Sequence, residues 1–161
     1  MSYDLEVCVL GQSNIKFKPQ RFGDIYLNVD PERRKAYADT FAYMAEQDGV
    51  WCSITEKVRL FSAMNICDIM CVKNKGQAGF PFWIDEDADM YVMQIVPEHR
   101  AAVLSVLEYL LEFSPKKQIM LLPRLQGYEA DNVCGVLGFD DFKRLLDDGK
   151  ILFNICYIIG K

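Results

Sequence analysis

The order in which strand-like and helix-like segments follow one another most constrains the fold of this chain. Short apolar runs typical of strands occur at residues 3–10, 15–17, 24–29, 65–72, 80–84, 90–96, 118–122 and 150–159. Two longer stretches, 30–47 and 97–111, carry apolar residues at spacings of three and four, which predicts helices. Strands and helices are mixed without a regular alternation. We therefore predict an α+β fold with a largely antiparallel sheet and two long helices on it.

The predicted helices have distinct starts and faces. Asp30-Pro31-Glu32 suits a helix start, because Asp can cap, Pro is tolerated in the first turn and Glu suits the positive end of the dipole. The 97–111 helix is apolar around most of its circumference, so we expect it to be buried on more than one side. Residues 138–146 predict a short amphipathic helix before the last strand.

The stretch 50–64 fits two structures. Ser53 and Glu56 have the spacing of a capping box, which favours a short helix with an apolar face. The part from Glu56 to Leu60 also suits a strand. We favour the helix for this stretch.

The middle of the chain predicts a second hairpin-like unit. The runs 80–84 and 90–96 are separated by a short acidic turn, which predicts a hairpin. Pro81 places the first of these strands at an edge, since proline cannot donate to a strand ladder. Farther on, 123–132 predicts a long loop and 135–138 only a turn before the short helix.

The length and charge of the chain limit the classes of function. Its 161 residues suit one domain, 1–161. Asp and Glu outnumber Lys and Arg by 23 to 18, which gives a net charge of −5. Binding to nucleic acid or to an anionic membrane surface needs Lys and Arg. We therefore expect neither ligand, whereas a basic protein partner is compatible with this charge.

The N-terminus and the cysteines predict a cytoplasmic protein. No basic segment followed by an apolar segment opens the chain, so we expect no signal peptide. The longest apolar stretches are shorter than the ~20 residues of a membrane span. The six cysteines fall mostly inside apolar runs, where free cysteine packs as a small hydrophobic residue. We expect reduced thiols in the core.

No recognisable catalytic, cofactor-binding or metal-binding motif is present. His99 is the single histidine, and a lone histidine in the first turn of a helix is most often on the surface. Cys67 and Cys71 invite a zinc interpretation, but zinc sites usually combine two such pairs or several histidines. On a strand these two side chains share a face, which suits a core. We predict a protein that is not an enzyme, with no catalytic residues, cofactor or metal.

The densest group of carboxylates lies in the predicted turn at 85–89. Alternate Asp residues resemble the start of a calcium loop, which requires Gly at its sixth position and Glu at its twelfth. This chain has Met90 and Val96 there. The alternatives are a solvated hairpin turn and a contact patch for a basic partner.

Aromatic residues lie beside this acidic turn, in Phe80-Pro81-Phe82-Trp83. An aromatic side chain next to carboxylates is the composition of a binding hot spot against a basic surface, although plain sheet packing also explains the run. A similar combination occurs in the predicted 123–132 loop. We predict as partner-binding residues Trp83, Asp85, Glu86, Asp87, Asp89, Tyr128, Glu129 and Asp131.

The segment 138–154, Gly-Phe-Asp-Asp-Phe-Lys-Arg-Leu-Leu-Asp-Asp-Gly-Lys-Ile-Leu-Phe-Asn, resembles the ending of some small bacterial immunity proteins. These are cytosolic antidotes to polymorphic or contact-dependent toxins. The resemblance implies a stoichiometric inhibitor that docks on a toxin domain, often a basic nuclease. Its acidic groups would pair with Lys and Arg of the toxin, and charge complementarity would speed association. No fixed functional residues can be carried over from these divergent families.

Immunity-type binding of a basic toxin domain is therefore the predicted function. One alternative is a small enzyme or ligand-binding protein whose site is assembled from scattered Asp, Glu, Tyr and Cys; a deep pocket around His99 or a cysteine would favour it. Another is an acidic inhibitor that mimics nucleic acid, which would need carboxylates along one face at phosphate-like spacing.

Overall fold

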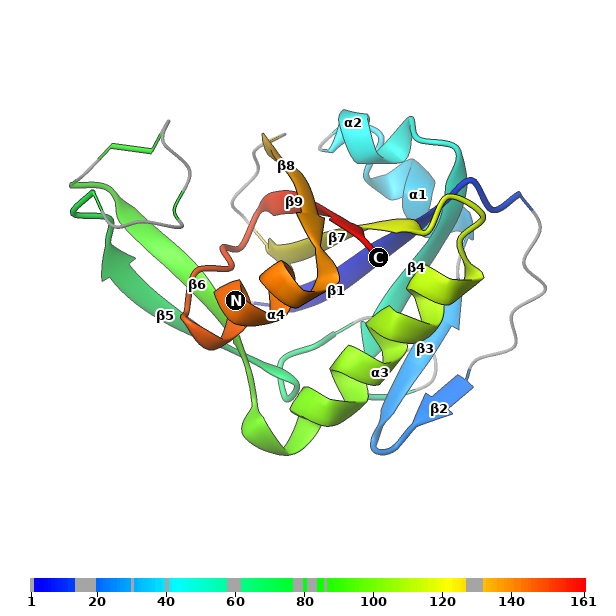
Figure 1. Cartoon of the computed structure of the whole chain (residues 1–161), viewed down its shortest axis with the longest axis horizontal. Coiled ribbons are helices and arrows are strands. Elements are labelled where there is room, and N and C mark those ends of the chain that lie inside the picture. The colour runs from blue at the N-terminus through cyan, green and yellow to red at the C-terminus, as the bar shows by residue number, and fades with distance from the viewer. Residues whose placement is uncertain are drawn as a thin grey trace.

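The part of the chain that the structure describes folds into a seven-stranded mixed sheet, a two-stranded hairpin and four helices (Figure 1). The computed structural model describes residues 2–13, 20–29, 31–39, 41–57, 62–76, 80, 84–85, 87–126 and 132–161. The arrangement confirms the predicted α+β class and the largely antiparallel sheet. None of the helices in this part of the chain is long and apolar enough to cross a membrane.

The strands of the main sheet lie in the order β2-β3-β4-β1-β7-β9-β8. Their bounds are β1 (Tyr3–Leu10), β2 (Gln20–Phe22), β3 (Ile25–Val29), β4 (Gly49–Thr55), β7 (Gln118–Leu125), β8 (Asn132–Gly138) and β9 (Ile155–Gly160). Neighbouring strands are antiparallel except for the parallel pair β8–β9. β1 lies in the middle between β4 and β7, so helices on both faces of the sheet can bury it.

The larger core lies between the sheet and the helices α3 (Pro97–Phe113) and α4 (Phe139–Asp147) (Figure 1). Both helices confirm predicted ones. The buried residues of α3 form one stripe, made of Val103, Val106, Leu107, Leu110 and Leu111. Burial of this helix on several sides is therefore wrong, because Ala101 is exposed and Leu104 is only half-buried.

The smaller core lies on the opposite face, which α1 (Pro31–Ala36) and α2 (Ala42–Ala45) cover. Cys8 of β1 belongs to it. Alternate residues of a strand point to the same face, so Asp4 and Glu6 lie on this side too, and both are buried. The alternation of β1 thus places two carboxylates beneath the α1–α2 segment.

The first predicted long helix, at 30–47, is wrong, because α1 and α2 are two short helices with a turn between them. Arg34 explains the break. Its guanidinium donates hydrogen bonds to the carbonyl oxygens of Ala45, Gln47 and Gly49. In a continuous helix Arg34 and Ala45 would lie about 16 Å apart, beyond the reach of an arginine. The turn lets Arg34 satisfy carbonyls at the end of α2, which have no partner within that helix.

Two further segments form strands where the sequence predicted other structures. The stretch 50–64 begins as β4, so the predicted helix is wrong there. β4 pairs with β1 and β3, and the Ser53 hydroxyl donates to buried Glu6 instead of capping a helix. The predicted turn at 135–138 belongs to β8, an edge strand of half-buried and exposed residues without a regular apolar alternation. The predicted strand at 15–17 lies outside the described residues.

A separate hairpin of β5 (Cys67–Lys73) and β6 (Asp89–Ile95) extends to one side of the main sheet (Figure 1). β6 confirms the predicted strand at 90–96, but its partner is β5. The predicted pairing with 80–84 is therefore wrong; Phe80 and Ile84 lie in bends, and 81–83 lie outside the described residues. The acidic segment consequently belongs to a longer connection than a two-strand turn.

The C-terminal segment joins the hairpin to the body of the protein. The Met93 amide donates to the Ile151 carbonyl at 2.7 Å, and the Phe153 amide donates to the Tyr91 carbonyl at 2.9 Å. These bonds run along the edge of β6 that β5 leaves open. They place the chain that follows α4 directly beside the acidic end of the hairpin.

Candidate partner-binding site

The acidic segment lies at the end of the hairpin where β5 ends and β6 begins. Asp85, Asp87 and Asp89 are all exposed, and Asp89 is the first residue of β6. The Ala88 amide donates to the Asp85 carbonyl at 3.0 Å, which closes a turn. These three predicted residues are therefore on the surface, where a partner can reach them. Glu86 lies outside the described residues.

Lys73 compensates one of these carboxylates. The strand register places it opposite Asp89, and its Nζ lies 2.6 Å from Asp89 Oδ1. The hydrogen bond and the charge of Asp89 raise the pKa of Lys73. Both side chains are more than half exposed, so the pair adds little stability. Within the described ranges no cation is paired with the carboxylates of Asp85 or Asp87.

The carboxylates of α4 differ from those of the hairpin, because basic side chains of the same molecule pair with them. The pairs are Asp140–Lys143 at 2.9 Å, Asp141–Arg144 at 3.2 Å and Asp147–Arg100 at 2.8 Å. The hydrogen bond from Lys143 lowers the pKa of Asp140. Asp85 and Asp87 of the hairpin end are therefore available to a partner, whereas these three carboxylates of α4 are already paired.

A pocket of about 160 Å³ opens beside the hairpin end. Its lining includes Asp89 and Tyr91 of β6, Asn132 of β8, and Phe153 and Asn154 of the C-terminal segment. The Asp89 side chain is 56% exposed, whereas Asn154 is only 9% exposed. The pocket thus combines a carboxylate open to solvent with a buried amide.

Two segments that the sequence predicts separately as partner-binding have their neighbouring described residues at this pocket. Trp83, Tyr128, Glu129 and Asp131 lie outside the described residues. Ile84 follows Trp83 in the sequence and Asn132 follows Asp131, and both line the pocket. The fold therefore brings together the described ends of the two predicted contact segments.

The pocket includes residues that the sequence reasoning missed. The apolar alternation predicts that Phe153 and Asn154 belong to the closing strand, but the chain makes a turn there before β9 begins. A left-handed backbone conformation at Asn154, with φ of 61°, accompanies this turn. Asparagine tolerates that conformation better than most residues, so an Asn inside an apolar run was the available signal.

A second pocket, of about 250 Å³, lies between β5–β6 and the helices, where Asp68, Gln94 and Leu146 line it. Neither pocket is lined by His99 or by a cysteine. His99 is half-buried in the first turn of α3. Among the described residues no group of three or more His, Cys, Asp or Glu could hold a metal ion.

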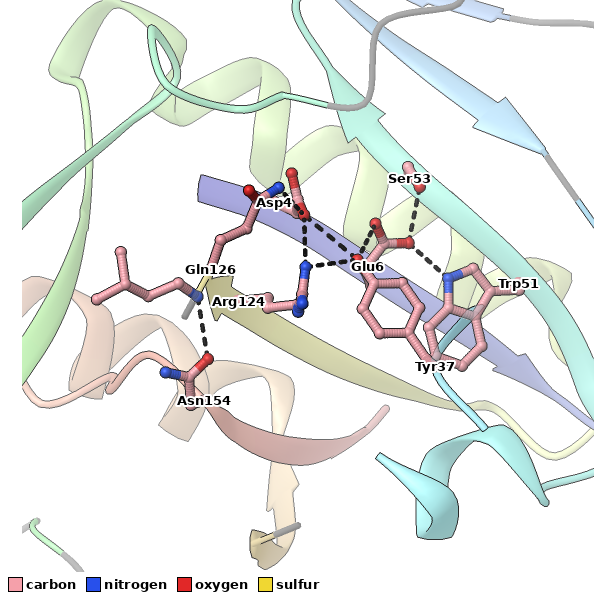
Figure 2. Close-up of polar contacts among 9 residues, drawn as sticks. Asp4, Glu6, Tyr37, Trp51, Ser53, Arg124, Gln126 and Asn154 are labelled. Carbon is pink, nitrogen blue, oxygen red and sulfur yellow. Dashed lines mark hydrogen bonds and ion pairs between the residues drawn. The ribbon is translucent and has the colours of Figure 1, made fainter. Parts of the chain in front are cut away.

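A buried polar network lies on the sheet face that α1 and α2 cover (Figure 2). Glu6 is 0% exposed, and its Oε2 accepts hydrogen bonds from Trp51 Nε1 at 2.5 Å and Ser53 Oγ at 2.7 Å. The register explains this contact, because Glu6 lies opposite Ser53, and Trp51, two residues before Ser53, is on the same face of β4. The Tyr37 ring stacks on Trp51 with centroids 5.3 Å apart.

Tyr37 and Arg124 connect a second carboxylate, that of Asp4, to this network. The Tyr37 hydroxyl lies 3.3 Å from Asp4 Oδ2 and 3.5 Å from Glu6 Oε1. Arg124 Nη1 lies 3.3 Å from Asp4 Oδ2, and its guanidinium is 4.8 Å from the centre of the Tyr37 ring. Because Tyr37 follows α1, these contacts hold the helical segment on the sheet. We interpret the network as structural, since both carboxylates are buried.

The cysteines agree only in part with the expectation of core thiols. All six are free; Cys8, Cys52, Cys67 and Cys156 are buried, Cys134 is half-buried and Cys71 is exposed. The expectation that Cys67 and Cys71 share the core is wrong for Cys71, because β5 has no described neighbour beyond β6.

We expect a thiol reagent at pH 8 to modify Cys71 first in the folded protein. Burial raises the pKa of the Cys8 thiol to about 11 and also raises those of Cys52 and Cys67. The thiolate is the reactive form, so a pKa near 11 leaves only about 0.1% of Cys8 reactive at pH 8. Mass spectrometry of digested protein measures the order. Labelling in urea is the control, and equal rates for Cys8 and Cys71 without urea would contradict the burial.

Comparisons with known proteins do not add to this description. No protein-family model, curated protein or solved structure matches the chain. The function of the chain is therefore inferred from the geometry of the described residues.

Proposed function

We propose that this chain is an immunity-type protein that binds a cognate toxin domain in a stoichiometric complex and neutralises it, without catalysis of its own. The observation that carries the proposal is the hairpin end. Exposed Asp85 and Asp87, which have no paired cation among the described residues, lie there near a pocket with Asp89 at its rim. An exposed charged rim around a small pocket is the anatomy of a protein–protein contact.

The segment that resembles immunity proteins supports the same location. Residues 138–154 include α4 and the turn after it, and this turn supplies Leu152, Phe153 and Asn154 to the pocket. The binding part of the proposal therefore depends on the geometry, and the neutralising part depends on the resemblance. Both concern the same region of the molecule.

The charge of the chain favours a basic partner, such as a nuclease domain. A net charge of −5 would attract a positively charged surface, and exposed Asp85 and Asp87 would contribute to that attraction at the hairpin end. The carboxylates of α4 are paired within the chain, which is unfavourable for a nucleic-acid mimic that needs a continuous acidic face. We place the complex in the cytoplasm.

The test is co-expression with the protein encoded next to this chain in its native genome. That protein is induced alone and together with the chain in a bacterial host, and growth is recorded. Rescue of growth, with a 1:1 complex of the purified proteins by light scattering, supports the proposal. A toxic neighbour that the chain neither binds nor neutralises refutes it for that partner. Rescue without a complex would point to the enzymatic alternative.

A further inference from the structure

We infer that the pocket beside the hairpin end receives one tyrosine side chain of the partner, flanked in the partner by lysine or arginine residues that pair with the carboxylates at its mouth. This inference rests on the proposed protein-binding function and names the anchor of that same contact. Its support comes from the size of the pocket, its walls, its buried amide and its rim.

The size of the pocket selects a side chain over a small-molecule ligand. Pockets for drug-sized ligands span about 300–1,000 Å³, and this one has about 160 Å³. A pocket below that range suits a single side chain better than a drug-sized ligand.

The walls of the pocket favour an aromatic ring. Met90 and Leu152 are almost fully buried, and two aromatic residues, Tyr91 and Phe153, also line the pocket. Aromatic rings gain from offset or edge-to-face contact with other rings beyond the area they bury. Aromatic side chains are also the commonest anchors in desolvated pockets at interfaces.

Asn154 distinguishes tyrosine from phenylalanine. Its Oδ1 accepts a hydrogen bond from the Leu125 amide at 3.0 Å, and no acceptor among the described residues meets its Nδ2. Figure 2 shows the amide nitrogen on the side away from that bond. A pocket-lining donor without an acceptor in the protein can bond a ligand oxygen in exchange for water, with the net effect of one hydrogen bond. A tyrosine hydroxyl can supply that oxygen at the end of an aromatic ring.

The carboxylates at the mouth of the pocket favour basic residues on both sides of the partner's tyrosine. They do not favour a basic side chain inside the pocket. Asp89 is more than half exposed at the mouth, and Asp85 and Asp87 lie nearby in the sequence on the surface. Cations of the partner therefore meet carboxylates outside the pocket. Inside it, the Asn154 Nδ2 is a donor and would oppose an ammonium or guanidinium group, which can only donate.

The test uses the full chain labelled with ¹⁵N and the blocked peptide acetyl-Lys-Gly-Tyr-Gly-Lys-amide. We expect saturable chemical-shift changes at Tyr91, Phe153 and the Asn154 side-chain amide. The peptide with Phe in place of Tyr should bind about two- to ten-fold more weakly, the effect of one hydrogen bond. The peptide with Ala there should give no saturable change at the pocket.

Equal shifts with the Ala peptide would overturn the inference, because the flanking charges alone would then explain binding. Equal affinity of the Phe and Tyr peptides would overturn the assignment of the hydroxyl to Asn154. Changes confined to other parts of the chain would also overturn it.

A second measurement separates this inference from the proposed function. Ile84→Trp should fill the pocket and weaken the complex with the neutralised toxin at least ten-fold, whereas Met64→Trp, at an exposed position before β5, is the matched control. If Ile84→Trp binds like the wild type, the inference fails while the 1:1 complex and the proposed function stand. If the wild type forms no complex, the proposed function fails.

Discussion

Replacing Glu6 with alanine is expected to destabilise the protein by about 3 kcal/mol or more. Glu6 is fully buried, and its Oε2 is the acceptor for both Trp51 Nε1 and Ser53 Oγ. Each buried donor left without an acceptor costs about 1–3 kcal/mol, and the lost side-chain volume adds a cavity. For a chain of this length the thermal midpoint should fall by about 6–12 °C. Urea and thermal unfolding measure both quantities.

Glu6→Gln is the matched control, because it keeps the shape and one oxygen. Trp51 and Ser53 donate to the same oxygen of Glu6, so an amide oxygen in that position can accept both bonds. The amide nitrogen can then donate to the Tyr37 hydroxyl. We expect Glu6→Gln to change the unfolding free energy by less than about 1 kcal/mol. If Glu6→Gln were as unstable as Glu6→Ala, the charge of Glu6, and not its hydrogen bonds, would stabilise the sheet face.

The sequence predicts correctly those elements whose apolar residues, spaced for a strand or a helix, are the residues that face the core. The strands β1, β6 and β7 and the helices α3 and α4 follow from apolar spacing, because each packs against the core along most of its length. The prediction of one helix at 30–47 is wrong because contacts between residues that are distant in the sequence determine the structure there. Arg34 can reach the carbonyls of Ala45 and Gln47, at and just after the end of α2, only if the helix breaks. The spacing of apolar residues carries no information on these contacts.

The stretch 50–64 failed for a related reason. Ser53 has the residue type and spacing of a helix cap, but β4 lies between β1 and β3, and the hydroxyl is used by Glu6. The partners of β4 lie elsewhere in the sequence, so the local pattern favoured a helix that tertiary pairing overrides.

The sequence predicts which residue types form the candidate site, but it does not predict which segments come together to form it. Charge density alone predicts the carboxylates of Asp85, Asp87 and Asp89, which are exposed. The pocket is assembled from Ile84, Asn132 and Asn154, which are far apart in the chain. Their meeting depends on the bonds between β6 and the segment after α4. The buried network had a local signal, since Asp4 and Glu6 alternate with Leu5 and Val7 in an apolar strand; this pattern places two carboxylates on one face.

The double substitution Asp85→Lys/Asp87→Lys is expected to slow association with the basic partner by about 10–100-fold at low salt. Both residues are exposed, and no cation among the described residues pairs with them, so folding stability should not change measurably. Reversing their charge replaces attraction by repulsion at the surface that the partner approaches. Stopped-flow association at increasing salt measures the effect. Near 0.15 M salt, screening acts over about 8 Å, so the difference should shrink as salt rises.

Asp140→Lys/Asp141→Lys changes the net charge by the same amount and is the matched control. These carboxylates are already paired with Lys143 and Arg144 on α4, so we expect association to slow by less than about three-fold, provided that circular dichroism shows an intact helix. A hairpin variant that alone slows association assigns the contact to the hairpin end. If both variants slowed it equally, net charge would govern binding, and the hairpin end would lose its claim to be the contact surface. A hairpin variant that associates at the wild-type rate at every salt concentration would remove Asp85 and Asp87 from the interface altogether.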